Sequence, residues 1–219
     1  EYFYPTEAAL LDLTLVASTT LGEPLRGQLA EPAASNYLIS GGTLAEMARC
    51  EPESLAALRA ALDEGRASIV GGSWDEPPTP LLAPESILAD LRRGLASYQT
   101  HLGRRPTVFG RRRFGLSPLL PGLLKTLGFS GACHFTLDGG RFPTGNRSKT
   151  RWEGLGRATL DALGRVPLDA SRGDTFLRLP EQLGRVLDLD PSAAASFAHW
   201  PGLASRFYGD LRRMARYSP

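Results

Sequence analysis

The chain has 219 residues, with 25 basic and 23 acidic side chains and a formal net charge of +2. This length holds one sizeable hydrophobic core without requiring two, so we expect a single domain over residues 1–219. The balanced charge and the lack of any apolar run near the roughly 18–20 residues that cross a bilayer predict neither nucleic-acid nor membrane partners. Because the chain starts with Glu1, we expect a segment of a longer protein, whose remaining domains are then its partners.

The two cysteines, Cys50 and Cys133, lie far apart in the sequence and form no Cys-x-x-Cys pair. This spacing indicates neither a disulfide framework nor a thiolate metal site. We expect both to be small residues of the hydrophobic core.

Apolar periodicity and the Gly and Pro positions predict helices and strands in alternation. In chain order they are a helix at 6–15, a strand at 36–40, a short helix from 43, a helix at 52–64, a strand at 67–70, a helix at 84–101, a strand at 107–109, a helix at 118–127, strands at 131–135, 150–153 and 158–167, a helix at 176–187, a strand at 194–199 and a helix at 204–216.

Strands that alternate with helices indicate an α/β fold, with a mainly parallel sheet covered by helices. If the sheet closes into a β/α barrel, the reactive groups lie at the carboxyl ends of its strands. This rule directs attention to residues 71–76, 109–117, 134–138 and 198–202.

Three segments have a distinctive order and spacing. Residues 69–77 read Ile-Val-Gly-Gly-Ser-Trp-Asp-Glu-Pro, residues 84–86 read Pro-Glu-Ser, and residues 114–118 read Phe-Gly-Leu-Ser-Pro. Together they resemble the catalytic domain of family 38 α-mannosidases, of which this chain would be a divergent member. The resemblance implies a (β/α)-barrel of the seven-stranded glycoside hydrolase/deacetylase type, incomplete in this segment.

Family 38 members are retaining glycosidases, which need a nucleophilic carboxylate and an acid/base carboxylate roughly 5–5.5 Å apart. In the family motif the nucleophile stands two residues before Phe-Gly, and this chain has Arg112 there. A guanidinium stays protonated and cannot attack carbon. The family's acid/base loop corresponds to residues 198–202, Ala-His-Trp-Pro-Gly, which hold no carboxylate. We therefore expect the family mechanism to be lost.

The family also uses zinc, held by a His-x-Asp near the first strand, by the nucleophile and by a later histidine. None of His101, His134 and His199 begins a His-x-Asp. An arginine at position 112 would also repel a nearby Zn²⁺. We predict no metal ligand and no cofactor in this segment.

Carboxylates elsewhere are the candidates for a replacement catalytic role. Asp75 and Glu76 follow the Gly-Gly strand end, and Asp138 follows another strand. His134, four residues before Asp138, could act with it as an oriented general base or as a second metal ligand. The alternative is that His134 is a satisfied polar residue and that residues 138–140 form a turn.

Aromatic and basic side chains at the strand ends are candidates for substrate binding. Trp74 and Trp200 could stack on sugar rings, as could Trp152, although packing alone also explains such residues. His199 precedes Trp200 and joins this group, together with His134.

The cluster of residues 111–113, Arg-Arg-Arg, has three interpretations, of which a nucleic-acid site is disfavoured by the near-neutral net charge. It could be an ordinary solvated charge run. Alternatively, strand alternation would point Arg112 one way and Arg111 and Arg113 the other, so that one face of the barrel mouth binds anions.

Three functions remain open. The first is a family 38-like barrel that binds a carbohydrate or an anionic glycan and is degenerate at the nucleophile position. The second is an active glycosidase whose site is rearranged around Asp75, Glu76 and Asp138 or completed from outside this segment. The third is a non-catalytic structural or interaction domain.

Overall fold

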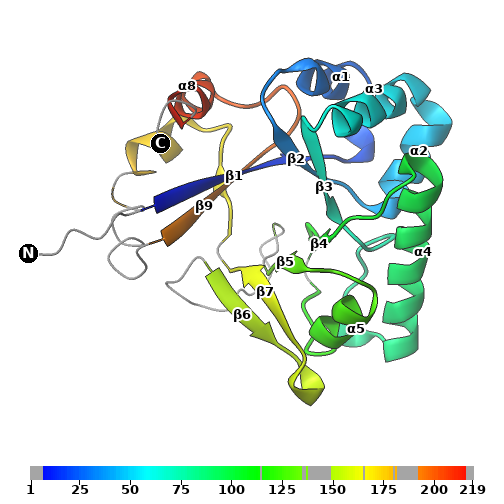
Figure 1. The fold of residues 1–219 in the computed structure, drawn as a ribbon. Helices are drawn as coiled ribbons and strands as arrows, with labels where there is room; N and C mark the ends of the chain where they lie inside the picture. Colours follow the sequence, from blue (N-terminus) through cyan, green and yellow to red (C-terminus); the bar gives the residue numbers. More distant parts are fainter. Residues whose placement is uncertain are drawn as a thin grey trace, which may run out of the picture.

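The computed structural model describes residues 7–113, 115–134, 137, 149–164, 166–179, 181 and 192–215. Within them, one curled sheet is surrounded by helices on its outer side (Figure 1). Its strands are β1 (Glu7–Leu15), β2 (Ser35–Leu38), β3 (Ala67–Gly71), β4 (Val108–Phe109), β5 (Gly131–Cys133), β6 (Lys149–Glu153), β7 (Thr159–Leu163), β8 (Leu168–Asp169) and β9 (Ser192–His199).

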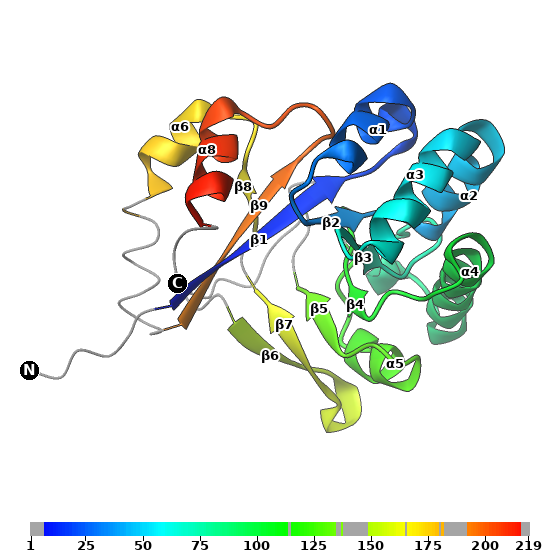
Figure 2. The ribbon, with the colours of Figure 1, turned by 45° about the horizontal axis from the view of Figure 1, so that its top comes forward.

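The helices that cover this sheet are named in chain order. They are α1 (Glu23–Ala30), α2 (Gly41–Cys50), α3 (Pro52–Asp63), α4 (Pro84–Leu102), α5 (Leu120–Thr126), α6 (Gly173–Leu177) and α8 (Arg206–Ala215). The last two lie beside β8 and β9 (Figure 2). No helix of the described ranges is both long and apolar enough to span a membrane.

The strand order is β6-β7-β5-β4-β3-β2-β1-β9-β8, and all the pairs are parallel except β6 with β7. In the described part of the chain, β6 and β8 are the two edges, so the curled sheet is an open barrel. The predicted incomplete α/β barrel is confirmed.

The helix predicted over residues 6–15 is wrong, because this segment is strand β1. It lies between two parallel strands, β2 and β9, and buries both faces. Leu11, Leu13 and Leu15 pack into the barrel interior, whereas Leu10 packs on the outer side with α6 and α8. A strand buried on both faces has apolar residues in both parities, and this pattern imitated helical spacing.

The barrel interior is filled by apolar side chains from several strands, among them Leu13, Leu38, Val70 and Cys133. The predicted core position of Cys133 is thus confirmed. Cys50 is exposed, so its predicted core position is wrong. It is the last residue of α2, where the helix turns away from the core.

Glycine lets α4 approach the end of β3 very closely. A Cβ on Gly94 would overlap the carbonyl oxygen of Gly72 and lie 2.7 Å from the carbonyl carbon of Ser73. A Cβ on Gly41, in the first turn of α2, would lie 2.7 Å from the Cα of Gly94. This contact fixes the position of the segment that follows β3.

Two backbone hydrogen bonds then join that segment to α2. The amides of Gly41 and Gly42 donate to the carbonyl oxygens of Ser73 and Trp74, each at 2.9 Å. The loop after β3 and the first turn of α2 therefore form one rigid wall at the carboxyl ends of the strands.

Candidate functional site

A cavity of about 960 Å³ opens at the carboxyl ends of the strands. Its described lining residues lie at the ends of strands, in the segments that follow them or on α2, at the end of the fold where β/α barrels carry their reactive groups. Four of the predicted site residues line it, namely Trp74, Asp75, Arg112 and Trp200. Arg113, Glu46 and the hydroxyl residues Ser18, Ser40 and Thr43 also line it.

The three consecutive arginines follow β4 and separate into two roles. Arg112 and Arg113 both line the cavity. Arg111 is fully buried, and its guanidinium donates from Nε to the carbonyl oxygen of Arg113 at 2.8 Å and from Nη2 to that of Pro77 at 2.5 Å. The predicted alternation is wrong, because β4 ends at Phe109 and the strand geometry does not continue through the triplet.

Glu76 holds the backbone of the two arginines in place. Its side chain is 3% exposed, and Oε2 accepts from the amides of Arg112 at 3.1 Å and Arg113 at 3.3 Å. The same oxygen lies 3.8 Å from the Nε of Arg112. The structure thus places Glu76, predicted as a replacement catalyst, beneath the arginine loop as a positioning residue.

Asp75 is exposed and lies on the rigid wall between β3 and α2. Its backbone amide donates to Oδ1 of Asp90 at 3.2 Å, and the amide of Trp74 donates to Oδ2 of Asp90 at 3.3 Å. Burial raises the pKa of Asp90 despite these hydrogen bonds. A Cβ on Gly42 would lie 2.9 Å from Oδ1 of Asp75, so this carboxylate reaches the first turn of α2.

Glu46 is a cavity residue that the sequence interpretation missed. It lies on α2, four positions after Gly42, and residues at this spacing share one face of a helix. Ser18, in the short 3-10 helix Ser18–Thr20 after β1, donates its hydroxyl hydrogen to Oε2 of Glu46. A single glutamate on an amphipathic helix resembles any solvated residue, so no sequence signal marked it.

The tryptophans lie in two different places. Trp74 and Trp200 line the cavity and are partly buried, and the guanidinium carbon of Arg93 lies 3.9 Å from the Trp74 ring centroid. Trp152 is buried in the outer layer and stacks on His134, with ring centroids 4.5 Å apart. Two of the three tryptophans are therefore placed to meet a ligand.

His134 is not among the cavity residues. Its ring stacks on Trp152 on the outer side of the sheet, and burial lowers its pKa. The neighbouring Cys133 points into the barrel instead, as strand alternation requires. Asp138 lies outside the described residues, so its predicted pairing with His134 stays a prediction.

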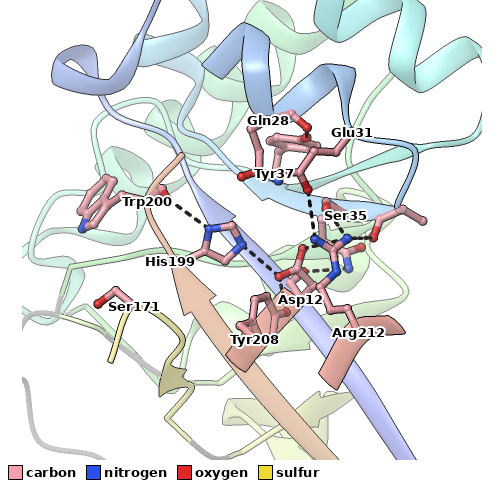
Figure 3. Close-up of polar contacts among 12 residues, drawn as sticks. Asp12, Gln28, Glu31, Ser35, Tyr37, Ser171, His199, Trp200, Tyr208 and Arg212 are labelled. Carbon is pink, nitrogen blue, oxygen red and sulfur yellow. Dashed lines mark hydrogen bonds and ion pairs between the residues drawn. The ribbon is translucent and has the colours of Figure 1, made fainter. Parts of the chain in front are cut away.

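His199 also lies away from the cavity. It is 2% exposed, and its Nε2 is 3.1 Å from Oδ1 of Asp12 while its Nδ1 is 3.1 Å from the carbonyl oxygen of Trp200 (Figure 3). The structure therefore separates His199 from Trp200, its neighbour in sequence, which does line the cavity.

Asp12 is the centre of a buried polar cluster under α8 (Figure 3). Besides the contact with His199, it accepts a hydrogen bond from the Tyr208 hydroxyl and lies 3.9 Å from the Arg212 guanidinium. Burial alone would raise the pKa of Asp12, but the hydrogen bonds and positive charges around it lower that pKa below its usual value. Because residues 6–15 were predicted as a helix, Asp12 was not among the predicted site residues.

The side chains of the cavity do not suit zinc. Its described lining offers the carboxylates of Asp75 and Glu46, hydroxyls and two guanidinium groups, with neither imidazole nor thiolate. Across the described ranges, no group of three or more His, Cys, Asp or Glu residues could hold a metal ion. Zinc sites use three or four protein ligands, drawn from the nitrogen of His, the sulfur of Cys and the carboxylates of Asp and Glu. The described lining of the cavity therefore does not form a zinc site.

This open β/α barrel carries tryptophans and charged side chains at the carboxyl ends of its strands. The model of the glycosyl hydrolases family 38 N-terminal domain matches residues 33–162, more than half of the chain. The chain belongs to this family, as a divergent member. A search of curated proteins returned no match.

Solved structures agree with this fold. The chain is similar to an α-mannosidase from Enterococcus faecalis V583, with a TM-score of 0.70, 14% identity, and coverage of 97% of this chain and 27% of that one. It is also similar to a 4-α-glucanotransferase from Thermococcus litoralis, with a TM-score of 0.63, 16% identity, and coverage of 95% and 36%. A protein assigned as a polysaccharide deacetylase from Mycobacterium smegmatis has a TM-score of 0.65, 13% identity, and coverage of 99% and 85%.

At 13–16% sequence identity, these similarities show only that the fold is shared. The chain spans between a quarter and two fifths of the mannosidase and the glucanotransferase. The predicted glycoside hydrolase/deacetylase type of barrel is confirmed by the mannosidase and deacetylase neighbours.

Proposed function

We propose that this domain binds an anionic glycan in the cavity at its strand ends and does not hydrolyse mannosides by the mechanism of its family. The observation that carries the proposal is the position of Arg112. It stands where the family motif has its nucleophile, and its side chain lines the cavity.

The geometry around Arg112 favours binding over catalysis. Glu76 accepts a hydrogen bond from the Arg112 amide, which fixes the backbone of this residue, and its Oε2 lies 3.8 Å from Nε. A positioned guanidinium binds carboxylate or sulfate through strong, charge-assisted hydrogen bonds. Arg113, also on the cavity, adds a second positive charge.

The aromatic residues support a sugar as the carrier of that anion. Trp74 and Trp200 line the same cavity as the arginines. Aromatic rings offer a flat apolar surface, and Trp also has a polar N–H for a wet site. A uronate-rich or sulfated polysaccharide combines both features.

Affinity chromatography of the full-length protein on a uronate-rich polysaccharide tests the proposal. Because hydrogen bonds to charged groups contribute about 1.5–3 kcal/mol each, Arg112→Ala should weaken binding roughly tenfold or more. Arg105→Ala is the matched control, since Arg105 is exposed just before β4, at the opposite end of the barrel. Equal retention of the Arg112→Ala variant and the wild type would show that Arg112 does not bind the glycan. This result would favour a structural or interaction domain.

Hydrolysis needs its own assay. The full-length protein should show no turnover of an aryl α-mannoside in the presence of zinc. Turnover that a chelator abolishes would contradict the assignment of Arg112 to the nucleophile position.

One observation favours a second candidate, an active glycosidase with a rearranged site. Asp75 and Glu46 both line the cavity, Asp75 beside the first turn of α2 and Glu46 one turn further along that helix. If they form a catalytic pair, a glycoside screen with the full-length protein should find a substrate, and both Asp75→Asn and Glu46→Gln should abolish its turnover. Both carboxylates lie on one wall, whereas a glycosidase pair flanks the scissile bond, so we place this candidate second.

A further inference from the structure

We infer that the glycan bound by this cavity carries a free amine as well as an anionic group. This inference rests on the proposed function and deepens it by naming the substrate class. Its basis is the separation of charge between two walls of one cavity.

The two walls come from different parts of the barrel. Arg112 and Arg113 follow β4 and supply the positive wall. Asp75 follows β3, and Glu46 lies on α2; together they supply the negative wall. Since the segment that carries Asp75 is tied to α2 by backbone hydrogen bonds, its backbone holds a fixed position relative to that helix.

Of the charged side chains that line this cavity, only Arg112 has an ion-pair partner among the described residues, the buried carboxylate of Glu76. Arg113, Asp75 and Glu46 make no ion pair with any residue that the structure describes. Arg112 has Glu76 near its Nε at 3.8 Å, and that nitrogen is buried without a hydrogen-bond partner. Charges lining a cavity gain most from a ligand of complementary charge on each side.

An amine matches the negative wall better than a neutral hydroxyl. A hydroxyl also donates a charge-assisted hydrogen bond to a carboxylate, but an ammonium adds the attraction between two opposite unit charges. Ser18 donates to Oε2 of Glu46, which holds this carboxylate in place on the cavity. An N-acetyl group on the same sugar would carry no charge and would lose this advantage.

The size of the cavity allows both walls to act on one ligand. Its volume of about 960 Å³ lies at the upper end of the range for small-molecule sites. We therefore place the amine and the anion on the same or on adjacent sugar units.

Three matched oligosaccharides test the inference with the full-length protein. Hyaluronan oligosaccharides carry the carboxylate alone, their de-N-acetylated forms carry carboxylate and amine, and chitosan oligosaccharides carry the amine alone. Binding is measured by calorimetry at about pH 5, where a sugar amine is protonated and carboxylates are still ionised, with a chelator present to exclude bound cations. The de-N-acetylated form should bind at least roughly tenfold more tightly than either of the others.

Variants connect this preference to the negative wall. Glu46→Gln and Asp75→Asn should each bring the affinity ratio of the de-N-acetylated to the acetylated form towards one. Glu53→Gln, on α3 with a side chain that is 80% exposed, is the control and should keep the wild-type ratio.

The outcomes separate the inference from the proposed function. The inferred amine would be refuted if the two hyaluronan forms bound equally, or if both variants kept the wild-type preference. Either result would leave the anionic-glycan proposal intact. No binding of either form would overturn both.

Discussion

The carboxylate of Glu76 lies directly beneath Arg112, with Oε2 3.1 Å from the backbone nitrogen and 3.8 Å from Nε of that residue. The same oxygen accepts from the amide of Arg113 at 3.3 Å. One buried acceptor therefore organises both arginines of the cavity. The backbone of Glu76 has a φ of +52°, in the left-handed region that non-glycine residues seldom adopt.

Glu76→Ala should destabilise the protein by about 2–4 kcal/mol, because two amides lose their acceptor and the Arg112 guanidinium loses its counter-charge. Glu76→Gln keeps a neutral acceptor and should cost about half as much. Urea denaturation measures both. Asp75→Asn, at the exposed neighbouring position, should change the unfolding free energy by less than about 0.5 kcal/mol. Equal losses at positions 75 and 76 would show that Glu76 does not hold the loop.

Gly94→Ala should destabilise the protein by about 1–3 kcal/mol, because its Cβ would overlap the backbone that follows β3. Gly27→Ala is the matched control within helix α1, where nothing lies within 4 Å of the new Cβ. There alanine should be neutral or stabilise by up to about 1 kcal/mol through its helix propensity. Thermal unfolding of the two variants side by side measures the difference, and a similar effect at both positions would refute the close approach of α4.

The cysteines should react differently with a thiol reagent. Cys50 is exposed, whereas Cys133 is buried in the barrel interior and its pKa is raised by burial to about 12. Since the thiolate is the reactive form, Cys50 should be labelled in the folded protein and Cys133 only after unfolding. Peptide mapping of the labelled protein identifies the site. Rapid labelling of Cys133 under native conditions would show that the barrel interior is open to solvent.

The parts of the site that could be predicted are those that depend on strand ends. Trp74, Asp75, Arg112 and Trp200 follow predicted strands, and a parallel sheet brings strand ends to one edge. What could not be predicted is on which side of the sheet a given side chain lies. This depends on the register of each strand, and one residue of difference moves a side chain to the opposite face.

His134 and His199 illustrate this limit. Both stand at strand ends, yet both face the outer helices, where they meet Trp152 and Asp12 respectively. Glu46 illustrates another limit, since its position on the cavity depends on how α2 packs against the barrel. The fold was accessible from local patterns and motif order, but β1 was predicted as a helix because burial on both faces removed the alternation, and α1 and β8 were not predicted.

Asp12→Asn should destabilise the protein by about 2–4 kcal/mol at neutral pH, because Arg212 and His199 then lie beside a neutral amide. Tyr208→Phe is a milder test of the same cluster. It keeps the ring contact with Phe197, at a centroid distance of 5.3 Å, and removes only the hydroxyl that donates to Asp12. The expected loss is about 1–1.5 kcal/mol, measured by urea denaturation.

The pH dependence of the Asp12→Asn effect follows from the lowered pKa of Asp12 in the folded protein. As the pH falls below about 3.9, the unfolded chain takes up a proton at this residue before the folded chain does, so protonation favours unfolding. The stability that the charged Asp12 provides is therefore present above that pH and is lost as the pH falls through its folded pKa. Wild type and Asp12→Asn should converge in stability under acid conditions. A difference that stays constant from neutral pH to about pH 3 would mean that the charge of Asp12 does not stabilise the packing of α8.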